Sequence, residues 1–209
     1  MIKSLCITIC TILFGVSLFA EADYQTGLTN ALHYFSSGRY WERMHATNII
    51  DSLVSTTTNE GNIAECNLLK AAALIECAEI EINDSAYSEA TNLCEAVKAE
   101  YYGRHDDWRL WGSILVGMQA MAAMEQYTNA FVAATNAISL SPPSDLEMPT
   151  NVWHALFGPD IPSRISLLDA FRINAADALI SIDKNADIFA YTNGLSQAGM
   201  DEVSELLDR

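Results

Sequence analysis

The stretch Tyr127–Pro142, YTNAFVAATNAISLSP, carries the pattern that decides the fold. Its small and apolar residues are spaced as on one side of a helix, and Pro142-Pro143 ends that helix because proline lacks a backbone N–H. The central tripeptide recurs, since Ala46-Thr47-Asn48, Ala90-Thr91-Asn92 and Ala134-Thr135-Asn136 follow one another at intervals of 44 residues. A fixed spacing of roughly 20–50 residues is typical of a repeat protein.

Helical periodicity continues on both sides of this stretch. Apolar residues recur every three to four positions, which predicts helices over about 23–36, 39–55, 63–82 and 86–102. A further helix starts at Asp106 or Asp107 and carries Trp108, Trp111, Leu115 and Met118 along one side. Gly112 and Gly117 lie inside it, and because glycine weakens a helix we expect neighbouring helices to approach closely there.

Capping residues mark several of these boundaries. Asn62, with Glu65 three positions later, resembles a capping box and predicts the start of a helix. Asn83-Asp84-Ser85 forms a turn that caps the next helix, and Gly103 ends that helix. Ser163 is expected to cap a helix that runs to about residue 182, followed by one or two helices that end near residue 207.

A fourth copy of the pattern lies near the C-terminus. Tyr191-Thr192-Asn193-Gly194-Leu195 resembles Tyr127–Phe131, but the spacing is 64 residues instead of 44. The excess of 20 is close to the length of the proline-containing segment 144–162. We therefore expect four helix hairpins in residues 23–209, with an irregular insertion at 144–162 between the third and the fourth.

The opening stretch resembles the second helix of a tetratricopeptide repeat. That helix begins with an aromatic residue, has small residues where the two helices touch and ends at a proline, as do Tyr127, Ala130, Ala134, Ala137 and Pro142. The period of 44 departs from the family period of about 34, and the first-helix pattern of Trp, Leu-Gly and Tyr is not in register. The resemblance implies an all-α, TPR-like short α-solenoid of about four antiparallel hairpins, which binds a protein or peptide on its concave face.

The N-terminus has the pattern of a secretory signal peptide. Lys3 precedes the apolar run Leu5–Phe19, and Ala20-Glu21-Ala22 follows as a cleavage site, which predicts a signal peptide over 1–22 and a periplasmic or secreted mature chain. The apolar run of about 15 residues is shorter than the roughly 20 that span a membrane. We therefore expect no stable membrane insertion after cleavage; an uncleaved anchor is the alternative.

The charge of the chain limits its partners. With 27 acidic and 11 basic residues, the net charge is −16, so binding to nucleic acid or to an anionic membrane is disfavoured, while a basic partner is favoured. Glycine-rich phosphate loops and metal-ligand spacings of histidine are absent from the sequence, and no cofactor is expected.

Three cysteines remain after the signal peptide: Cys66, Cys77 and Cys94. Cys66 and Cys77 would lie about 16 Å apart on one helix, which is beyond disulfide reach. Cys77 and Cys94 face each other across a hairpin, but about 6 Å apart along the axis. We expect three small buried thiols, with a Cys77–Cys94 disulfide as the alternative.

Two groups of residues are candidates for partner binding. Asn48, Asn92 and Asn136 form a regularly spaced polar row whose amides can bond to a peptide backbone, although a structural or solvent-facing row is the alternative. Trp153, His154 and Phe157 lie in the insertion, where aromatic side chains can anchor an interface or cover the end of the third hairpin.

His105-Asp106-Asp107 is the densest polar cluster. It suits a metal site or a general base beside carboxylates. It also lies at an expected helix start, where aspartate caps exposed N–H groups, and this is the interpretation that we favour.

The sequence therefore favours an exported protein–protein interaction or scaffold module of the cell envelope, without intrinsic catalysis. One alternative is a hydrolytic or metal-dependent enzyme that uses the His105-Asp106-Asp107 cluster. A second alternative is a structural envelope protein that associates with itself.

Overall fold

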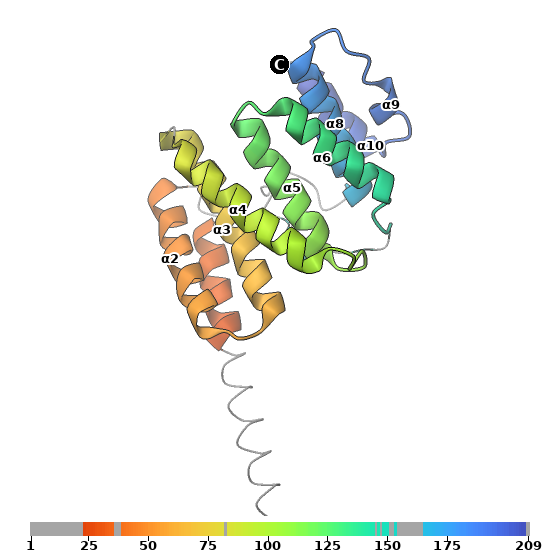
Figure 1. Ribbon diagram of the computed structural model, residues 1–209. Helices are drawn as coiled ribbons and strands as arrows, with labels where there is room; N and C mark the ends of the chain where they lie inside the picture. Colours follow the sequence, from red (N-terminus) through yellow and green to blue (C-terminus); the bar gives the residue numbers. More distant parts are fainter. Residues whose placement is uncertain are drawn as a thin grey trace, which may run out of the picture.

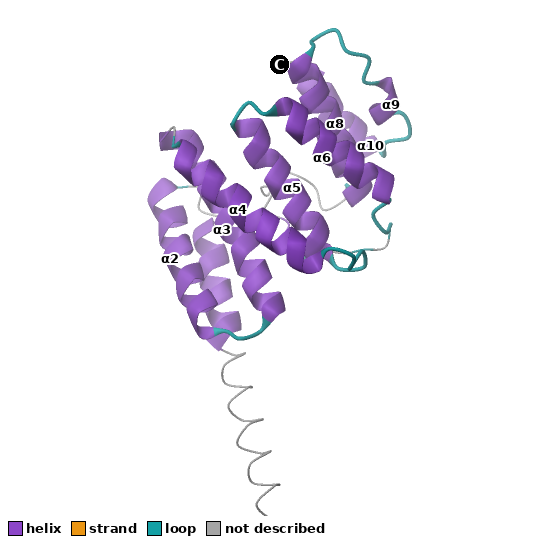
Figure 2. Cartoon of the chain, viewed as in Figure 1, coloured by secondary structure: helices purple, strands orange, loops and turns teal. Residues whose placement is uncertain are grey.

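The structure is a computed structural model that describes residues 23–35, 39–81, 83–144, 146, 148–150, 153 and 165–207. Over these ranges the regular secondary structure is entirely helical, as Figure 2 shows. The expected signal peptide at 1–22 and most of the insertion at 144–162 lie outside the described residues.

A helix over 23–35 comes first, and the elements that follow agree with the expected ranges within a few residues. They are α2 (Tyr40–Thr56), α3 (Glu60–Glu81), α4 (Asp84–Tyr101), α5 (Trp108–Ala123), α6 (Tyr127–Leu140), α8 (Leu167–Ile182), α9 (Phe189–Thr192) and α10 (Gln197–Leu207), shown in Figure 1.

Helices that follow one another in the chain pack against one another. From α2 to α6 each helix contacts the next, α6 contacts α8, and α8 contacts both α9 and α10. In addition, α5 contacts α3 and α8, so it lies at the centre of the row (Figure 1). This arrangement confirms the all-α fold class and is compatible with a helical repeat.

The repeated tripeptide lies within the second helix of each of the first three pairs, as expected: α2, α4 and α6. Its alanines, Ala46, Ala90 and Ala134, have no exposed surface. Each threonine hydroxyl donates to a carbonyl of its own helix: Thr47 to Met44 at 2.8 Å, Thr91 to Tyr87 at 3.0 Å, and Thr135 to Phe131 at 3.0 Å. Each asparagine is exposed.

The equivalence of Tyr191–Leu195 with Tyr127–Phe131 is wrong. Tyr127 begins the long helix α6, whereas Tyr191 lies near the end of the four-residue helix α9. Gly194 has a φ of +85°, which turns the chain between α9 and α10. Asp169 on α8 holds this turn, because its carboxylate accepts from the backbone N–H of Ser196 at 3.3 Å.

Two of the expected helix caps are also wrong, while two are confirmed. The helix expected to begin after Ser163 begins at Leu167 as α8, where the side chain of Ser166 accepts from the backbone N–H of Asp169; Ser163 itself lies outside the described residues. At the start of α3 the cap is Asn59, whose side chain accepts from the backbone N–H of Asn62 at 3.2 Å. Asn83 and Asp107 cap α4 and α5 as expected, since each accepts from the N–H two residues on.

Gly112 and Gly117 lie where α5 meets its neighbours, and the expected close approach is confirmed at Gly112 but not at Gly117. A methyl group at Gly112 would lie 3.3 Å from Cδ1 of Leu68 on α3 and 3.4 Å from Cε of Met148. At Gly117 it would lie 3.5 Å from Cβ of Cys94 on α4, which is an ordinary contact distance. The space at Gly117 therefore admits an alanine, while the space at Gly112 is tighter.

We expect Gly117→Ala to raise the free energy of unfolding by up to about 1 kcal/mol, because alanine favours a helix over glycine. Gly112→Ala should gain less or nothing, since side chains on two sides must shift. Urea denaturation followed by circular dichroism measures both changes. A loss of stability in Gly117→Ala would mean that α4 and α5 approach more closely than described.

Candidate functional site

A groove with a volume of about 370 Å³ lies between α4 and α6, with α5 as its floor. The floor is largely apolar and comes from Leu110, Ile114, Gly117 and Met121 of α5. The α4 side contributes an ion pair, in which the Lys98 ammonium donates to the Glu95 carboxylate. An open groove with an apolar floor and a few polar groups at its edge is a typical binding site.

Two apolar side chains at the edge of the groove are exposed. Tyr102, just after α4, has 78% of its surface exposed, and Leu140, at the end of α6, has 48%. Apolar and aromatic side chains in such positions often become buried when a partner docks. Their exposure beside a preformed hollow marks this side of the molecule as the candidate site.

The α6 wall of the groove carries no charge. None of the residues Tyr127–Leu140 is acidic or basic, although the chain as a whole has a net charge of −16. Its outward-facing side chains include Asn129, Val132 and Asn136, all of which are exposed. The centres of protein interfaces are depleted of charged residues. An uncharged exposed helix face is therefore more typical of a docking surface than of a helix that only faces solvent.

The structure brings together two residues that the sequence placed in different candidate groups. His105, from the loop before α5, and Asn136, near the end of α6, both line the groove. Asn48 and Asn92 are exposed on α2 and α4 and do not line it. The amide of Asn136 is therefore the member of the asparagine row that lies at the candidate site.

Trp153 lies in the hydrophobic core, with 6% of its surface exposed. Its backbone N–H donates to the carbonyl of Pro149 at 2.9 Å. In this position the indole covers the core and is not an exposed anchor for a partner. His154 and Phe157 lie outside the described residues.

The three residues of the His105-Asp106-Asp107 cluster do not converge on one point. Asp107 caps α5 and forms an ion pair with Arg109 at 3.2 Å, while Asp106 is exposed. The backbone carbonyl of His105 accepts from Nε1 of Trp111 at 2.9 Å. Within the ranges that the structure describes, no three His, Cys, Asp or Glu side chains are close enough to hold a metal ion.

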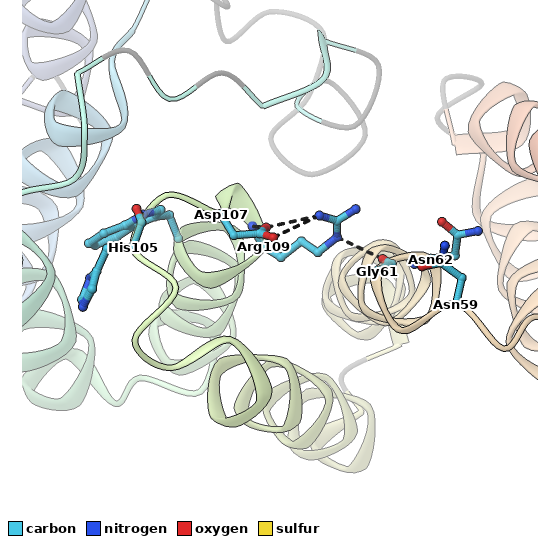
Figure 3. Close-up of polar contacts among 7 residues, drawn as sticks. Asn59, Gly61, Asn62, His105, Asp107 and Arg109 are labelled. Atoms are coloured by element: carbon cyan, nitrogen blue, oxygen red, sulfur yellow. Dashed lines mark hydrogen bonds and ion pairs between the residues drawn. The ribbon is translucent and has the colours of Figure 1, made fainter.

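Arg109 joins the start of α5 to the first turn of α3. Its Nε donates to the carbonyl of Gly61 at 3.0 Å, and Nη1 donates to the Asp107 carboxylate, as Figure 3 shows. The guanidinium also lies over the Trp108 ring, 4.9 Å from its centre. These contacts fix the first turn of the helix that forms the floor of the groove, and they give Asp107 a structural role.

We expect Asp107→Ala to lower the free energy of unfolding by about 1–2 kcal/mol, because it removes both the helix cap and the partner of Arg109. Asp106→Ala is the matched control, since that side chain is exposed, and it should change stability by less than about 0.5 kcal/mol. Thermal or urea unfolding measures both. Equal effects of the two substitutions would contradict the capping role.

The three cysteines at positions 66, 77 and 94 are buried thiols in the structure, which agrees with the favoured interpretation and not with a Cys77–Cys94 disulfide. Burial raises the pKa of the Cys66 thiol to about 11 and that of Cys94 to about 12. Cys66 also donates a weak hydrogen bond to the Tyr24 hydroxyl at 3.9 Å. Thiols that are both buried and protonated react slowly.

We expect the folded protein to react with almost no thiol reagent at pH 8, because the thiolate is the reactive form and burial disfavours it. In denaturant, without a reducing agent, the cysteines at 66, 77 and 94 should all react. Absorbance after addition of a chromogenic disulfide reagent counts the free thiols. A shortfall of two thiols in the denatured protein would instead indicate a disulfide.

No helix in the part of the chain that the structure describes is long and apolar enough to cross a membrane. In the comparisons with known proteins, no family model matches the chain, and no curated protein or solved structure is significantly similar to it.

Sequence reasoning did not find the groove. Most of its lining residues are alanine, glycine, serine or aliphatic side chains, which have the same pattern as an ordinary helix contact. The signal that was available is the absence of charge, since Glu125 is the only charged residue between Leu110 and Ser144.

Proposed function

We propose that this chain is an exported interaction or scaffold module of the cell envelope, built as a TPR-like α-solenoid, that binds a protein or peptide segment in the groove between α4 and α6. The proposal includes cleavage of the signal peptide after residue 22 and a periplasmic or secreted location, for which the N-terminal sequence is the support. It also assigns no catalysis to the chain.

The observation that carries the proposal is the combination of an open groove with an uncharged wall. Tyr102 and Leu140 expose apolar surface directly beside the hollow, and the α6 wall adds amide and hydroxyl groups without charge. A partner segment can therefore bury apolar surface without removing a charged group of this helix from water, which would be costly. The backbone of an extended segment finds hydrogen-bond partners in Asn136 and Ser139.

A capture experiment tests the proposal. The full-length chain is expressed with its own N-terminal segment, purified in the form that the host exports, and used as bait in the envelope fraction of the parent cell. We expect a specific partner at near-stoichiometric yield, and the double substitution Tyr102→Ser with Leu140→Ser should reduce capture roughly tenfold or more, as for loss of interface anchors.

The matched control is Phe189→Ser with Ile182→Ser. These side chains expose 65% and 47% of their surfaces, close to the values for the tested pair, but neither lines the groove. Circular dichroism establishes that both variants keep their helices. Capture that falls equally in both variants, or in neither, would contradict binding at the groove.

A further inference from the structure

One repeat earlier, the space between α2 and α4 over α3, here called the first groove, is occupied by a lysine. Lys70, on α3, reaches between α2 and α4: its ammonium donates to the Asp51 carboxylate at 2.9 Å and lies 3.1 Å from the Glu89 carboxylate. Only 19% of the Lys70 side chain is exposed, so its stem covers the surface of α3. The cation between these two helices is therefore a residue of the chain itself.

The two grooves correspond residue by residue at the repeat spacing. The residues 44 positions after Asp51, Lys70 and Glu89 are Glu95, Ile114 and Ala133, and all three line the open groove. Burial supports this register, because the neighbours of Lys70 and of Ile114 are buried in matching pairs: Leu69 and Ser113, Ala71 and Leu115, Ala72 and Val116, Ala73 and Gly117.

The open groove therefore keeps one acid of the bridge, but it has no cation at the position equivalent to Lys70. Ile114 stands at the position equivalent to Lys70, and the smaller Ala133 at the position equivalent to Glu89. Glu95 pairs instead with Lys98, one turn along its own helix, where both side chains are substantially exposed. Such exposed pairs contribute little, so Glu95 can exchange this partner for another at small cost.

The first groove also shows that a cation is stable in this setting. Burial by itself lowers the pKa of Lys70, but the hydrogen bonds and charges of Asp51 and Glu89 outweigh it and raise the pKa above its ordinary value. An ammonium between two of these helices thus stays charged at neutral pH. The net charge of −16 adds a long-range attraction for basic segments.

We propose that the open groove binds a lysine side chain from a peptide segment of a basic protein partner, in the place that Lys70 takes one repeat earlier. The stem lies over Ile114, and the ammonium reaches the Glu95 carboxylate and the side-chain oxygens of Asn136 and Ser139. The volume of about 370 Å³ leaves room for a neighbouring apolar side chain beside Tyr102 and Leu140. This inference rests on the proposed function, because the lysine belongs to the bound protein.

Short synthetic peptides test the specificity directly. The probe is an acetylated and amidated alanine-rich peptide with two leucine–lysine pairs, and its two controls replace each lysine by norleucine or by glutamate. NMR titration of the ¹⁵N-labelled full-length chain, in its exported form, up to about 5 mM peptide covers the range expected for so small a contact. We expect saturable shifts around Glu95, Ile114 and Asn136 with the lysine peptide, and much weaker ones with both controls.

Substitutions then separate recognition of the lysine from general attraction of charge. Glu95→Gln should lower the affinity for the lysine peptide about threefold, and Lys98→Ala should raise this affinity about twofold. These are the sizes expected of exposed ion pairs. Glu100→Gln is the matched control, since Glu100 is an exposed acid on the same helix that does not line the groove. It should leave affinity nearly unchanged.

Ile114→Lys with Ala133→Glu rebuilds the bridge of the first groove. The chain then fills its own groove, so peptide binding should be lost while the melting temperature is kept or raised.

The inference is overturned if no peptide binds saturably, if the norleucine peptide binds as tightly, if Glu100→Gln has the effect of Glu95→Gln, or if spermidine alone reproduces the shifts. If the envelope partner is still captured after the bridge is rebuilt, the chain is an interaction module but this groove is not its lysine site.

Discussion

An alanine without exposed surface lies at the centre of α2, α4 and α6, and the packing of the whole row of helices depends on it. A methyl group at Ala46, Ala90 and Ala134 lets the neighbouring helix approach, whereas a larger side chain would force the pair apart. The threonine that follows bonds to its own helix, and the asparagine after it is then directed to solvent. The repeated tripeptide is therefore a packing unit, and the exposure of Asn48 and Asn92 is a consequence of that packing.

Much of the fold could be predicted because it is encoded locally. Apolar spacing located the helices within a few residues, and Asn83, Gly103 and Asp107 marked boundaries through their own backbone or side-chain chemistry. The errors arose where two capping residues compete. Asn59 and Asn62 offer the same side-chain oxygen three residues apart, as Ser163 and Ser166 do in the sequence, and the spacing of apolar residues does not choose between such neighbours; Asn59 and Ser166 are the residues that cap. Likewise, Gly194 permits the turn that separates Tyr191 from a long helix.

The candidate site was harder to predict, because the open groove is marked by the absence of a lysine and a glutamate that the preceding repeat has. Ile114 and Ala133 are unremarkable in a helical sequence, and they gain meaning only beside Lys70 and Glu89 one repeat earlier. The convergence of His105 and Asn136 follows from antiparallel packing, since the start of α5 and the end of α6 lie at the same end of the pair. In the sequence the two residues belong to separate groups, because the sequence shows neighbours along the chain and not contacts across the hairpin.

The helix beneath the open groove, α5, does not need an ion-pair bridge because contacts with other helices hold it in place. In the first groove α3 is tied to both flanking helices by Lys70. Among the described residues no ion pair ties α5 to its flanking helices in this way, but α5 contacts α3 and α8 as well as α4 and α6. Its Trp111 is fully buried and meets Phe171 of α8 edge to face, with ring centres 5.9 Å apart. Burial of an aromatic pair of this kind stabilises the fold by more than a half-exposed ion pair does. A bridge at position 114 is thus not needed to hold α5, and a groove can stay open there without weakening the row of helices around it.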